Sequence, residues 1–253
     1  MNTDQILSVK GVPLPSRPVL FMETTADAAL ASARSLAKRL DEFGVNIQDG
    51  NILDIGCGYG RIAYGLLERG YSGNYTGVDI INTRIDWLRE HFTPDCGNYA
   101  FHHIDVVNEH YNPKGRLNST DIEFTGFVGE QPLDSIILLS VFTHMYEPEL
   151  TAYLHQLFRV TGPETRVIIT MFLYTDARLA SLDRNAKFRF AQVIDKNCRC
   201  ERADNPLQAI AYQEDKARQL FEAAGFSIEI AHGSWNGDQA PHLQDWITAR
   251  RIV

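Results

Sequence analysis

The strongest constraint on the fold is the run of residues 52–61, in which an apolar stretch carrying Asp54 leads into three closely spaced glycines, Gly56, Gly58 and Gly60. Glycine has no Cβ and tolerates positive φ, so the backbone can turn tightly here and come within contact distance of a ligand. A helix predicted over residues 61–69 would direct its first backbone N–H groups at that ligand. A bare turn is disfavoured, because so many glycines cost stability that such a turn does not need. The run therefore predicts a strand, a turn that binds a nucleotide-like ligand, and a helix.

The spacing of the glycines separates two classes of cofactor. A dinucleotide fingerprint requires a third glycine at position 61, where this chain has Arg61, and this weakens a nicotinamide assignment. An apolar run with Asp54, followed by G-x-G-x-G, resembles motif I of the class I S-adenosylmethionine-dependent methyltransferases. The resemblance implies that the loop wraps the methionine end of the cofactor, and that Asp54 orders the loop and approaches the cofactor's ammonium group directly or through water. The cofactor contacts implied at this loop are Asp54, Gly56, Cys57, Gly58, Gly60 and Arg61.

Strand-like and helix-like segments alternate along the chain. Apolar residues recur at helical spacing from 27 to 43, and further helices are predicted over residues 82–92, 148–160 and 215–224. Strands are predicted over residues 52–55, 74–80, 99–105, 134–141, 166–173, 226–231 and 243–250. This alternation is typical of a parallel sheet, and the turn at residues 233–238 suits an antiparallel pair. Together with the resemblance, it implies an α/β, Rossmann-like, doubly wound sheet of seven strands, mostly parallel with an antiparallel final strand, plus a lid insertion.

Three segments interrupt this alternation. Residues 1–22 contain Pro13, Pro15 and Pro18 and are predicted to form an irregular arm. Residues 109–133 are predicted to form an ordered surface excursion, and the polar residues 176–205 an inserted lid or helical cap. We therefore expect an arm and helix over residues 1–45, and a methyltransferase domain over residues 46–253 with insertions at about 109–133 and 176–212.

Acidic residues end two of the predicted strands, at the edge where open parallel sheets bind ligands. Asp79 is placed to accept hydrogen bonds from two vicinal ribose hydroxyls, and the resemblance assigns it that role with Ile80 beside it. The resemblance also assigns the adenine contact to Asp105 and Val106. It places Ser140 against the methionine moiety.

His144 follows the most apolar predicted strand and is a candidate catalytic base. An imidazole with a pKa near ~6.5 accepts a proton from a substrate hydroxyl or ammonium at neutral pH. The alternative is a histidine at a helix start that packs against Tyr146. The substrate contacts predicted near it are Tyr111, Tyr146, Trp235 and Asp245.

Charge and composition narrow the classes of partner. The net charge of −8 disfavours a protein whose main partner is a phosphate backbone. We expect no membrane span and no signal peptide, hence a cytoplasmic protein. The cysteines at positions 57, 96, 198 and 200 match neither a disulfide framework nor a C-x-x-C metal pattern, so no metal is expected.

The function predicted from these observations is S-adenosylmethionine-dependent methyl transfer to oxygen or nitrogen of a small molecule or sugar, by a monomer or homodimer. The later motifs, such as Gly233-Ser234-Trp235, resemble a bacterial subgroup associated with glycan or secondary-metabolite assembly. Three alternatives stay open: a protein or nucleic-acid methyltransferase, a catalytically inactive cofactor-binding subunit, and a nicotinamide enzyme.

Overall fold

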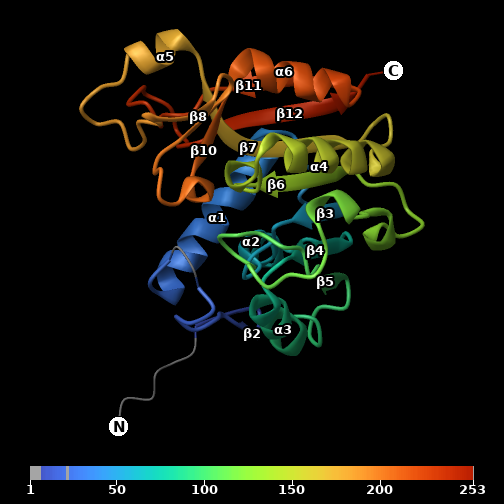
Figure 1. Cartoon of the computed structure of the whole chain (residues 1–253). Helices are drawn as coiled ribbons and strands as arrows, with labels where there is room; N and C mark the ends of the chain where they lie inside the picture. The colour runs from blue at the N-terminus through green and yellow to red at the C-terminus, as the bar shows by residue number, and fades with distance from the viewer. Residues whose placement is uncertain (1–6, 21–22, 253) are drawn as a thin grey trace. The chain divides into compact units, whose positions relative to one another are not determined.

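A computed structural model describes residues 7–20 and 23–252 of the chain (Figure 1). The chain divides into two compact units. Unit 1 comprises residues 1–105 and 127–136, and unit 2 comprises residues 106–126 and 137–253. Within the described residues, no helix is both long enough and apolar enough to cross a membrane.

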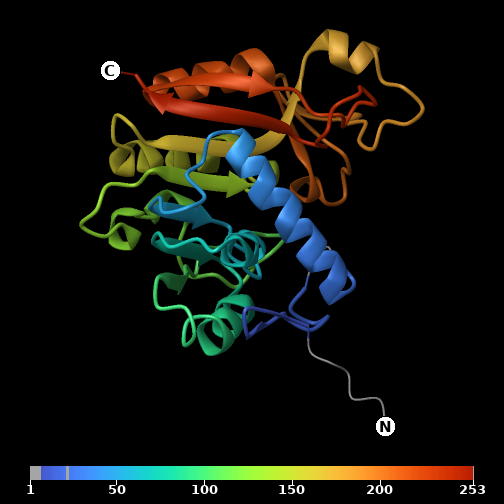
Figure 2. The ribbon, with the colours of Figure 1, turned by 180° about the vertical axis from the view of Figure 1, so that it is seen from behind.

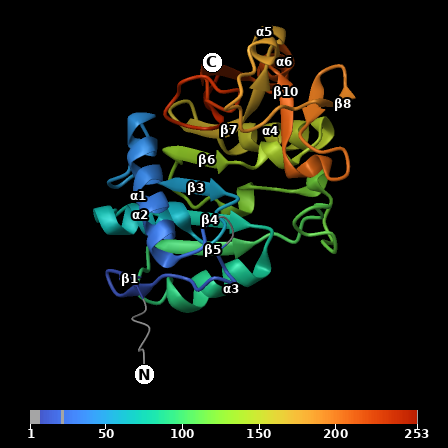
Figure 3. The same cartoon turned by 90° about the vertical axis from the view of Figure 1, so that its left-hand side faces the viewer.

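Unit 1 is built on three parallel strands, which lie side by side in Figure 3. β3 (Ile52–Ile55) pairs with β4 (Tyr75–Asp79), and β4 pairs with β5 (Tyr99–His103). Helix α2 (Arg61–Arg69) connects β3 to β4, and α3 (Asn82–His91) connects β4 to β5. The predicted alternation of strands and helices is confirmed here.

Helix α1 (Ala26–Glu42) packs against α2 within the same unit (Figure 2). Thr25 caps it by accepting a hydrogen bond from the Ala28 N–H. Small side chains allow the close approach, since a Cβ on Gly65 of α2 would lie 2.4 Å from the carbonyl oxygen of Ala33. The predicted helix is thus confirmed, with its small-residue face turned to α2.

The N-terminal arm was predicted to be irregular, but part of it is regular. It contains a short hairpin of β1 (Ser8–Val9) and β2 (Val12–Pro13), and the Tyr64 hydroxyl of α2 donates a hydrogen bond to the Pro13 carbonyl. Residues 1–6 and 21–22 of the predicted arm lie outside the described residues. A two-residue strand is too short for a periodic pattern, so the sequence carried no signal for it.

Unit 2 is organised around β7 (Arg166–Tyr174), which is buried along nearly its whole length. β12 (Asp245–Arg251) pairs antiparallel with β7, and β11 (Phe226–Ala231) pairs antiparallel with β12, which confirms the antiparallel final strand. β6 (Ser135–Leu139) begins in unit 1 and ends in unit 2. The helices of unit 2 are α4 (Glu147–Val160), α5 (Asp176–Ala180) and α6 (Glu214–Ala223).

The segment after β7 forms strands, so a helical cap over residues 176–205 is contradicted. β8 (Gln192–Asp195), β9 (Cys198–Cys200) and β10 (Ile210–Gln213) form an antiparallel array, and β10 adds in parallel to the end of β7. These strands add to the seven predicted ones. They are short, and β8 is mostly exposed, so neither strand nor helix periodicity was visible.

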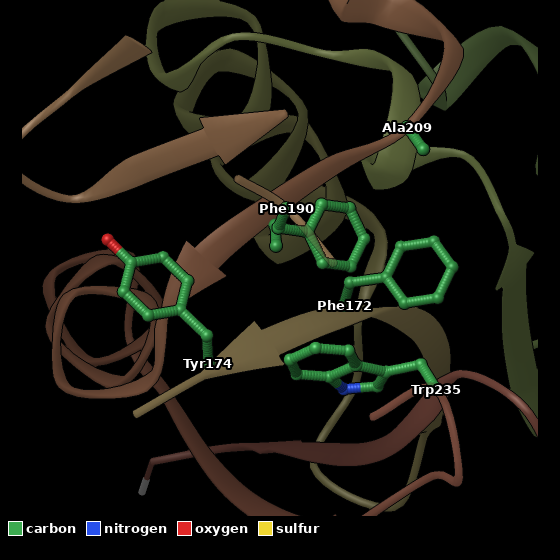
Figure 4. Packing of buried hydrophobic residues seen from close by; sticks show 6 residues of the cluster. Phe172, Tyr174, Phe190, Ala209 and Trp235 are labelled. Carbon is green, nitrogen blue, oxygen red and sulfur yellow. The ribbon is translucent and has the colours of Figure 1, made fainter. Parts of the chain in front are cut away.

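An aromatic cluster fixes this added layer (Figure 4). Phe172 and Tyr174 of β7 pack with Phe190 and Trp235 from the flanking loops. The Phe190 and Trp235 rings meet edge to face, with centroids 5.2 Å apart. The loops after β7 and β11 are therefore part of the core of unit 2.

Residues 109–133 are ordered, as predicted. They contain two short 3-10 helices, η1 (Ser119–Asp121) and η2 (Thr125–Phe127). Two more, η3 (Phe142–His144) and η4 (Pro206–Gln208), lie later in the chain. Of these, η3 and η4 bring His144 and Leu207 together in unit 2.

Candidate functional site

The glycine turn after β3 is held by backbone hydrogen bonds to β4. Gly56, Gly58 and Gly60 have φ angles of 81°, 59° and 85°, a region that side chains other than glycine rarely adopt. The N–H groups of Gly56 and Cys57 both donate to the Val78 carbonyl, at 2.7 and 3.1 Å. The turn is therefore shaped before any ligand arrives.

Gly60 and Gly58 differ in what surrounds them. A Cβ on Gly60 would lie 2.7 Å from Leu88 Cδ2, so Gly60 is needed for packing against α3. A Cβ on Gly58 would meet nothing within 4 Å. The turn thus presents bare backbone to open space at Gly58, where a ligand can lie against it.

Asp79 at the end of β4 is tied to this turn. Its Oδ2 accepts a hydrogen bond from the Gly58 N–H at 2.7 Å, and its Oδ1 accepts one from the Ile81 N–H at 2.8 Å. The side chain is 7% exposed, and burial raises the pKa of its carboxyl while the two N–H groups oppose that shift. A carboxylate has about four acceptor positions, so each oxygen keeps capacity for one more donor.

Asp54 faces the interior of unit 1. It is buried and accepts a hydrogen bond from the Tyr75 hydroxyl, and burial raises the pKa of its carboxyl to about 7. Both the predicted approach of Asp54 to a cofactor ammonium, direct or through water, and its predicted effect on the order of the loop stay predictions.

Arg61 and Cys57 also turn inward. The Arg61 guanidinium binds Glu23 Oε1 at 3.2 Å and Ser32 Oγ at 3.3 Å, and burial raises the pKa of the Cys57 thiol. The predicted cofactor contacts of these two residues stay predictions.

Glu23 was missed by the sequence reasoning. Its carboxylate interacts with the buried Tyr59 hydroxyl beside the glycine turn, and burial together with this interaction raises the pKa of Tyr59. No sequence pattern marked Glu23, because it lies just beyond the arm of residues 1–22 and only the fold brings it to Arg61.

The residues that follow β4 and β5 include the predicted adenine contacts. Ile80 is half-buried, and its carbonyl accepts a hydrogen bond from His103 Nε2 at 3.2 Å. Asp105 is half-buried at the end of unit 1. Val106 is only 2% exposed and forms a bridge with Leu117, and its predicted contact with an adenine ring stays a prediction.

A second group of polar side chains gathers around His144 in unit 2. His144 Nδ1 lies 2.7 Å from the Leu207 carbonyl oxygen, which can only accept, so Nδ1 carries the proton. Its Nε2 lies 3.2 Å from the Tyr111 hydroxyl, which then donates to it. Burial lowers the pKa of the imidazole to about 4, so the ring is neutral at physiological pH.

Asn108 holds Tyr111 and His144 together. Its Nδ2 donates to the His144 carbonyl at 3.1 Å, and its Oδ1 accepts from the Tyr111 N–H at 3.0 Å. The Tyr111 and His144 rings meet edge to face at 4.9 Å. Tyr146 is partly buried at the start of α4, where its own N–H donates to Glu149 Oε2 at 2.7 Å. The structure thus places Tyr111 in contact with His144. The sequence analysis had named the two residues only as a predicted substrate contact and a candidate base.

Ser140 has an unusual conformation at the end of β6. Its φ is 61°, although it is not glycine. Its N–H donates to Thr170 Oγ1 at 2.9 Å and its hydroxyl to Gln244 Oε1 at 2.9 Å. Such strained residues concentrate at functional sites, so this geometry agrees with a functional role for the position.

Trp235 and Asp245 do not face a substrate, and that prediction is contradicted. Both are fully buried. Asp245 accepts hydrogen bonds from the N–H groups of Leu173 (2.7 Å) and Gly233 (2.8 Å), from Arg178 Nη1 (2.7 Å) and from Trp235 Nε1 (3.1 Å). Burial would raise the pKa of Asp245, but these donors and His232 outweigh it and hold the pKa below its usual range. The two residues anchor the loop after β11.

Comparisons with known proteins give a family match, a curated relative and several structural neighbours. The family model described as "Methyltransferase domain" matches residues 28–230. The malonyl-[acyl-carrier protein] O-methyltransferase of Acetivibrio thermocellus is 29% identical over 110 residues, which cover 40% of this chain. The match spans 38% of the length of that curated relative.

Two solved structures share the fold. Magnesium protoporphyrin IX methyltransferase from Synechocystis PCC 6803 superimposes with a TM-score of 0.51 at 16% identity, over 88% of this chain and 79% of that one. An O-methyltransferase family protein from Burkholderia thailandensis gives 0.58 at 14% identity, over 89% and 58%. At these identities the likeness establishes the Rossmann-like fold alone.

Proposed function

The chain belongs to the methyltransferase domain family, and from that premise we propose that it transfers a methyl group from S-adenosylmethionine to oxygen or nitrogen of a small molecule or sugar. The observation that carries the proposal is Asp79, whose carboxylate is bound to the Gly58 N–H and keeps acceptor capacity beside the open face of the glycine turn. Acid and turn together fit a ligand that has vicinal hydroxyls.

The residues of unit 1 fit the cofactor. Asp79 would accept hydrogen bonds from the ribose hydroxyls, with Ile80 and Asp105 next to it for the adenine. The Glu23 carboxylate lies between Arg61 and Tyr59 beside the turn, and we propose that it contributes, with Asp54, to binding the ammonium group of the methionine moiety. When bound, S-adenosylmethionine supplies an electrophilic methyl group on a sulfonium centre.

The residues of unit 2 suit the acceptor. His144 is neutral and its Nε2 accepts from the Tyr111 hydroxyl, so a proton can pass from an acceptor hydroxyl to the Tyr111 oxygen as the Tyr111 proton moves to Nε2. An acceptor oxygen that has lost its proton in this way would be the nucleophile for the methyl group of the bound donor. Ser140 and Tyr146 are proposed to border this reaction, because they flank the segment that carries His144.

Calorimetric titration of the purified protein with S-adenosylmethionine tests the proposal. Asp79→Asn should weaken binding by ~10-fold or more, since it removes the charged acceptor. Asp95→Asn, an exposed acid in the same unit, is the matched control and should bind like wild type.

A parallel titration uses reduced nicotinamide dinucleotide. Absence of S-adenosylmethionine binding to the wild type, or equal binding by Asp79→Asn, refutes the cofactor assignment. Binding of the nicotinamide cofactor instead would replace it.

A further inference from the structure

A cavity of about 390 Å³ lies in unit 2, and no residue that lines it has been given a catalytic or cofactor-binding role so far. Two loops line it, one after α5 and one between β11 and β12. Its polar side chains are Asn185, Lys187, Ser234, Asp238 and His242. The volume is within the range of small-molecule pockets.

The topology places this cavity where α/β folds bind ligands. β7 and β11 each pair antiparallel with β12, so they run in the same direction. One loop follows the carboxyl end of β7 by way of α5, and the other directly follows the carboxyl end of β11 (Figure 1). Ligands of open sheets lie beyond the carboxyl ends of parallel strands.

A hydrogen-bond network joins the cavity wall to Ser140. Gln244 follows the lining residue Leu243, and its Oε1 accepts from the hydroxyls of Ser140 and Thr170. Ser140 is the strained residue proposed above to border the reaction. The segment that lines the cavity is therefore fastened, through the residue that follows it, to the strand end at which Ser140 lies.

The two loops are fastened to each other and to the core. The N–H groups of Asp183 and Lys187 donate to the carbonyls of Asn236 (3.2 Å) and Trp235 (3.0 Å). Below them, Arg178 Nη2 donates to the Gly233 carbonyl at 2.8 Å. A cavity held in this way binds a ligand with little cost for ordering its walls.

The lining chemistry selects among ligand classes. Lys187 and Asp238 carry opposite charges, so a simple anion would gain one favourable partner and meet one unfavourable one. No Phe, Tyr or Trp is among the described residues that line the cavity, which leaves the His242 imidazole as its one aromatic ring. Hydroxyl groups both donate and accept, and they match this mixture of amide, hydroxyl, ammonium and carboxylate.

We propose that this cavity binds a polyhydroxylated, sugar-like methyl acceptor, with Lys187 and Asp238 as its principal hydrogen-bonding residues. The proposal rests on the proposed function and specifies its acceptor class.

Saturation-transfer NMR on the full chain, with and without S-adenosylhomocysteine, tests it. One pool contains glucose, galactose, mannose, N-acetylglucosamine and rhamnose, and a second contains the proteinogenic amino acids. The variants are Lys187→Met and Asp238→Asn, and the control is Asp204→Asn, an exposed acid of unit 2 outside the cavity.

Saturation transfer to at least one monosaccharide, reduced about 5-fold or more in both variants and unchanged in the control, is the expected result. No transfer to any monosaccharide, undiminished transfer in both variants, or transfer confined to the amino acids overturns the proposal. Calorimetry with S-adenosylmethionine distinguishes the proposed methyl transfer from the proposed sugar binding. Absence of S-adenosylmethionine binding refutes the methyl-transfer function. Sugar binding that depends on Lys187 and Asp238 is measured separately, without the methyl donor.

Discussion

Replacing Asp245 by Asn should destabilise unit 2 severely. Asp245 is fully buried and accepts hydrogen bonds from Arg178, Trp235 and two backbone N–H groups. An amide keeps one acceptor oxygen but turns an NH2 group toward the other donors, and it leaves the guanidinium of Arg178 buried without a counter-charge. Breaking a buried ion pair from one side costs ~3–5 kcal/mol, a large part of the ~5–15 kcal/mol that stabilises a typical protein.

The matched control is Asp204→Asn. Asp204 pairs with Arg202 at 2.6 Å, but the two side chains are 68% and 57% exposed. Such surface pairs contribute about 0–1 kcal/mol. The contrast between the two variants therefore isolates burial as the cause.

Urea unfolding at pH 7 measures both variants, followed by tryptophan fluorescence, with Trp235 and Trp246 reporting on unit 2 and Trp87 on unit 1. If the units unfold separately, the loss should fall on the transition of unit 2. Because the folded pKa of Asp245 is lowered, its contribution is present above the unfolded pKa of about 3.9 and is lost as the pH falls through the folded pKa. A loss under ~1 kcal/mol in Asp245→Asn, equal to that in Asp204→Asn, would refute the anchoring role.

Three further predictions concern the two candidate sites. Gly60→Ala should cost ~1–3 kcal/mol of stability in urea unfolding, because the new Cβ meets Leu88 at a φ of 85° that alanine disfavours; a neutral result would contradict the packing described. His144→Ala should lower kcat by ~10²–10⁴ while the Kd for S-adenosylmethionine stays unchanged, and Tyr111→Phe should lower kcat as well; near-normal turnover by His144→Ala removes the base assignment. Since the pKa of His144 is about 4, this group should leave kcat flat between about pH 5 and 8, and a limb near 6.5 would show an exposed imidazole. Asp54 has a folded pKa of about 7, so its contribution to stability is full below about pH 4 and is lost as the pH rises to about 7; this fall should be absent from Asp54→Asn in chemical unfolding at several pH values.

Local sequence patterns were sufficient for much of unit 1. The apolar run and the glycines at 56, 58 and 60 predicted a strand, a turn and a helix, and all three glycines have positive φ. The position of Asp79 at the end of β4, next to the turn, was likewise predictable. In a parallel β-α-β unit the carboxyl ends of neighbouring strands meet at one edge, so the chain order alone brings the acid to the glycines.

Contacts between segments far apart in the chain could not be predicted from the sequence. Asp245 was predicted to bind a substrate. Nothing in the local sequence shows that Arg178, Trp235 and two backbone N–H groups converge on it, so its burial could not be foreseen. The strands of residues 192–213 were missed for a related reason, since short strands bury too few residues to show a period of two. Glu23 lies in a segment with no pattern, and only the fold sets it against Arg61.

The sequence by itself determined the alternating α/β order, the antiparallel last strand, the glycine turn and the acid that holds it, because each depends on residues a few positions apart or on strand order. Only the tertiary structure decided which polar side chains remain available to a ligand. It paired Asp54 with Tyr75, enclosed Asp245 and Trp235, joined His144 to Tyr111, and left Lys187 and Asp238 at the wall of a cavity. The physical reason is that burial and hydrogen-bond partnership depend on segments tens of residues apart, whereas backbone preference and periodicity are local.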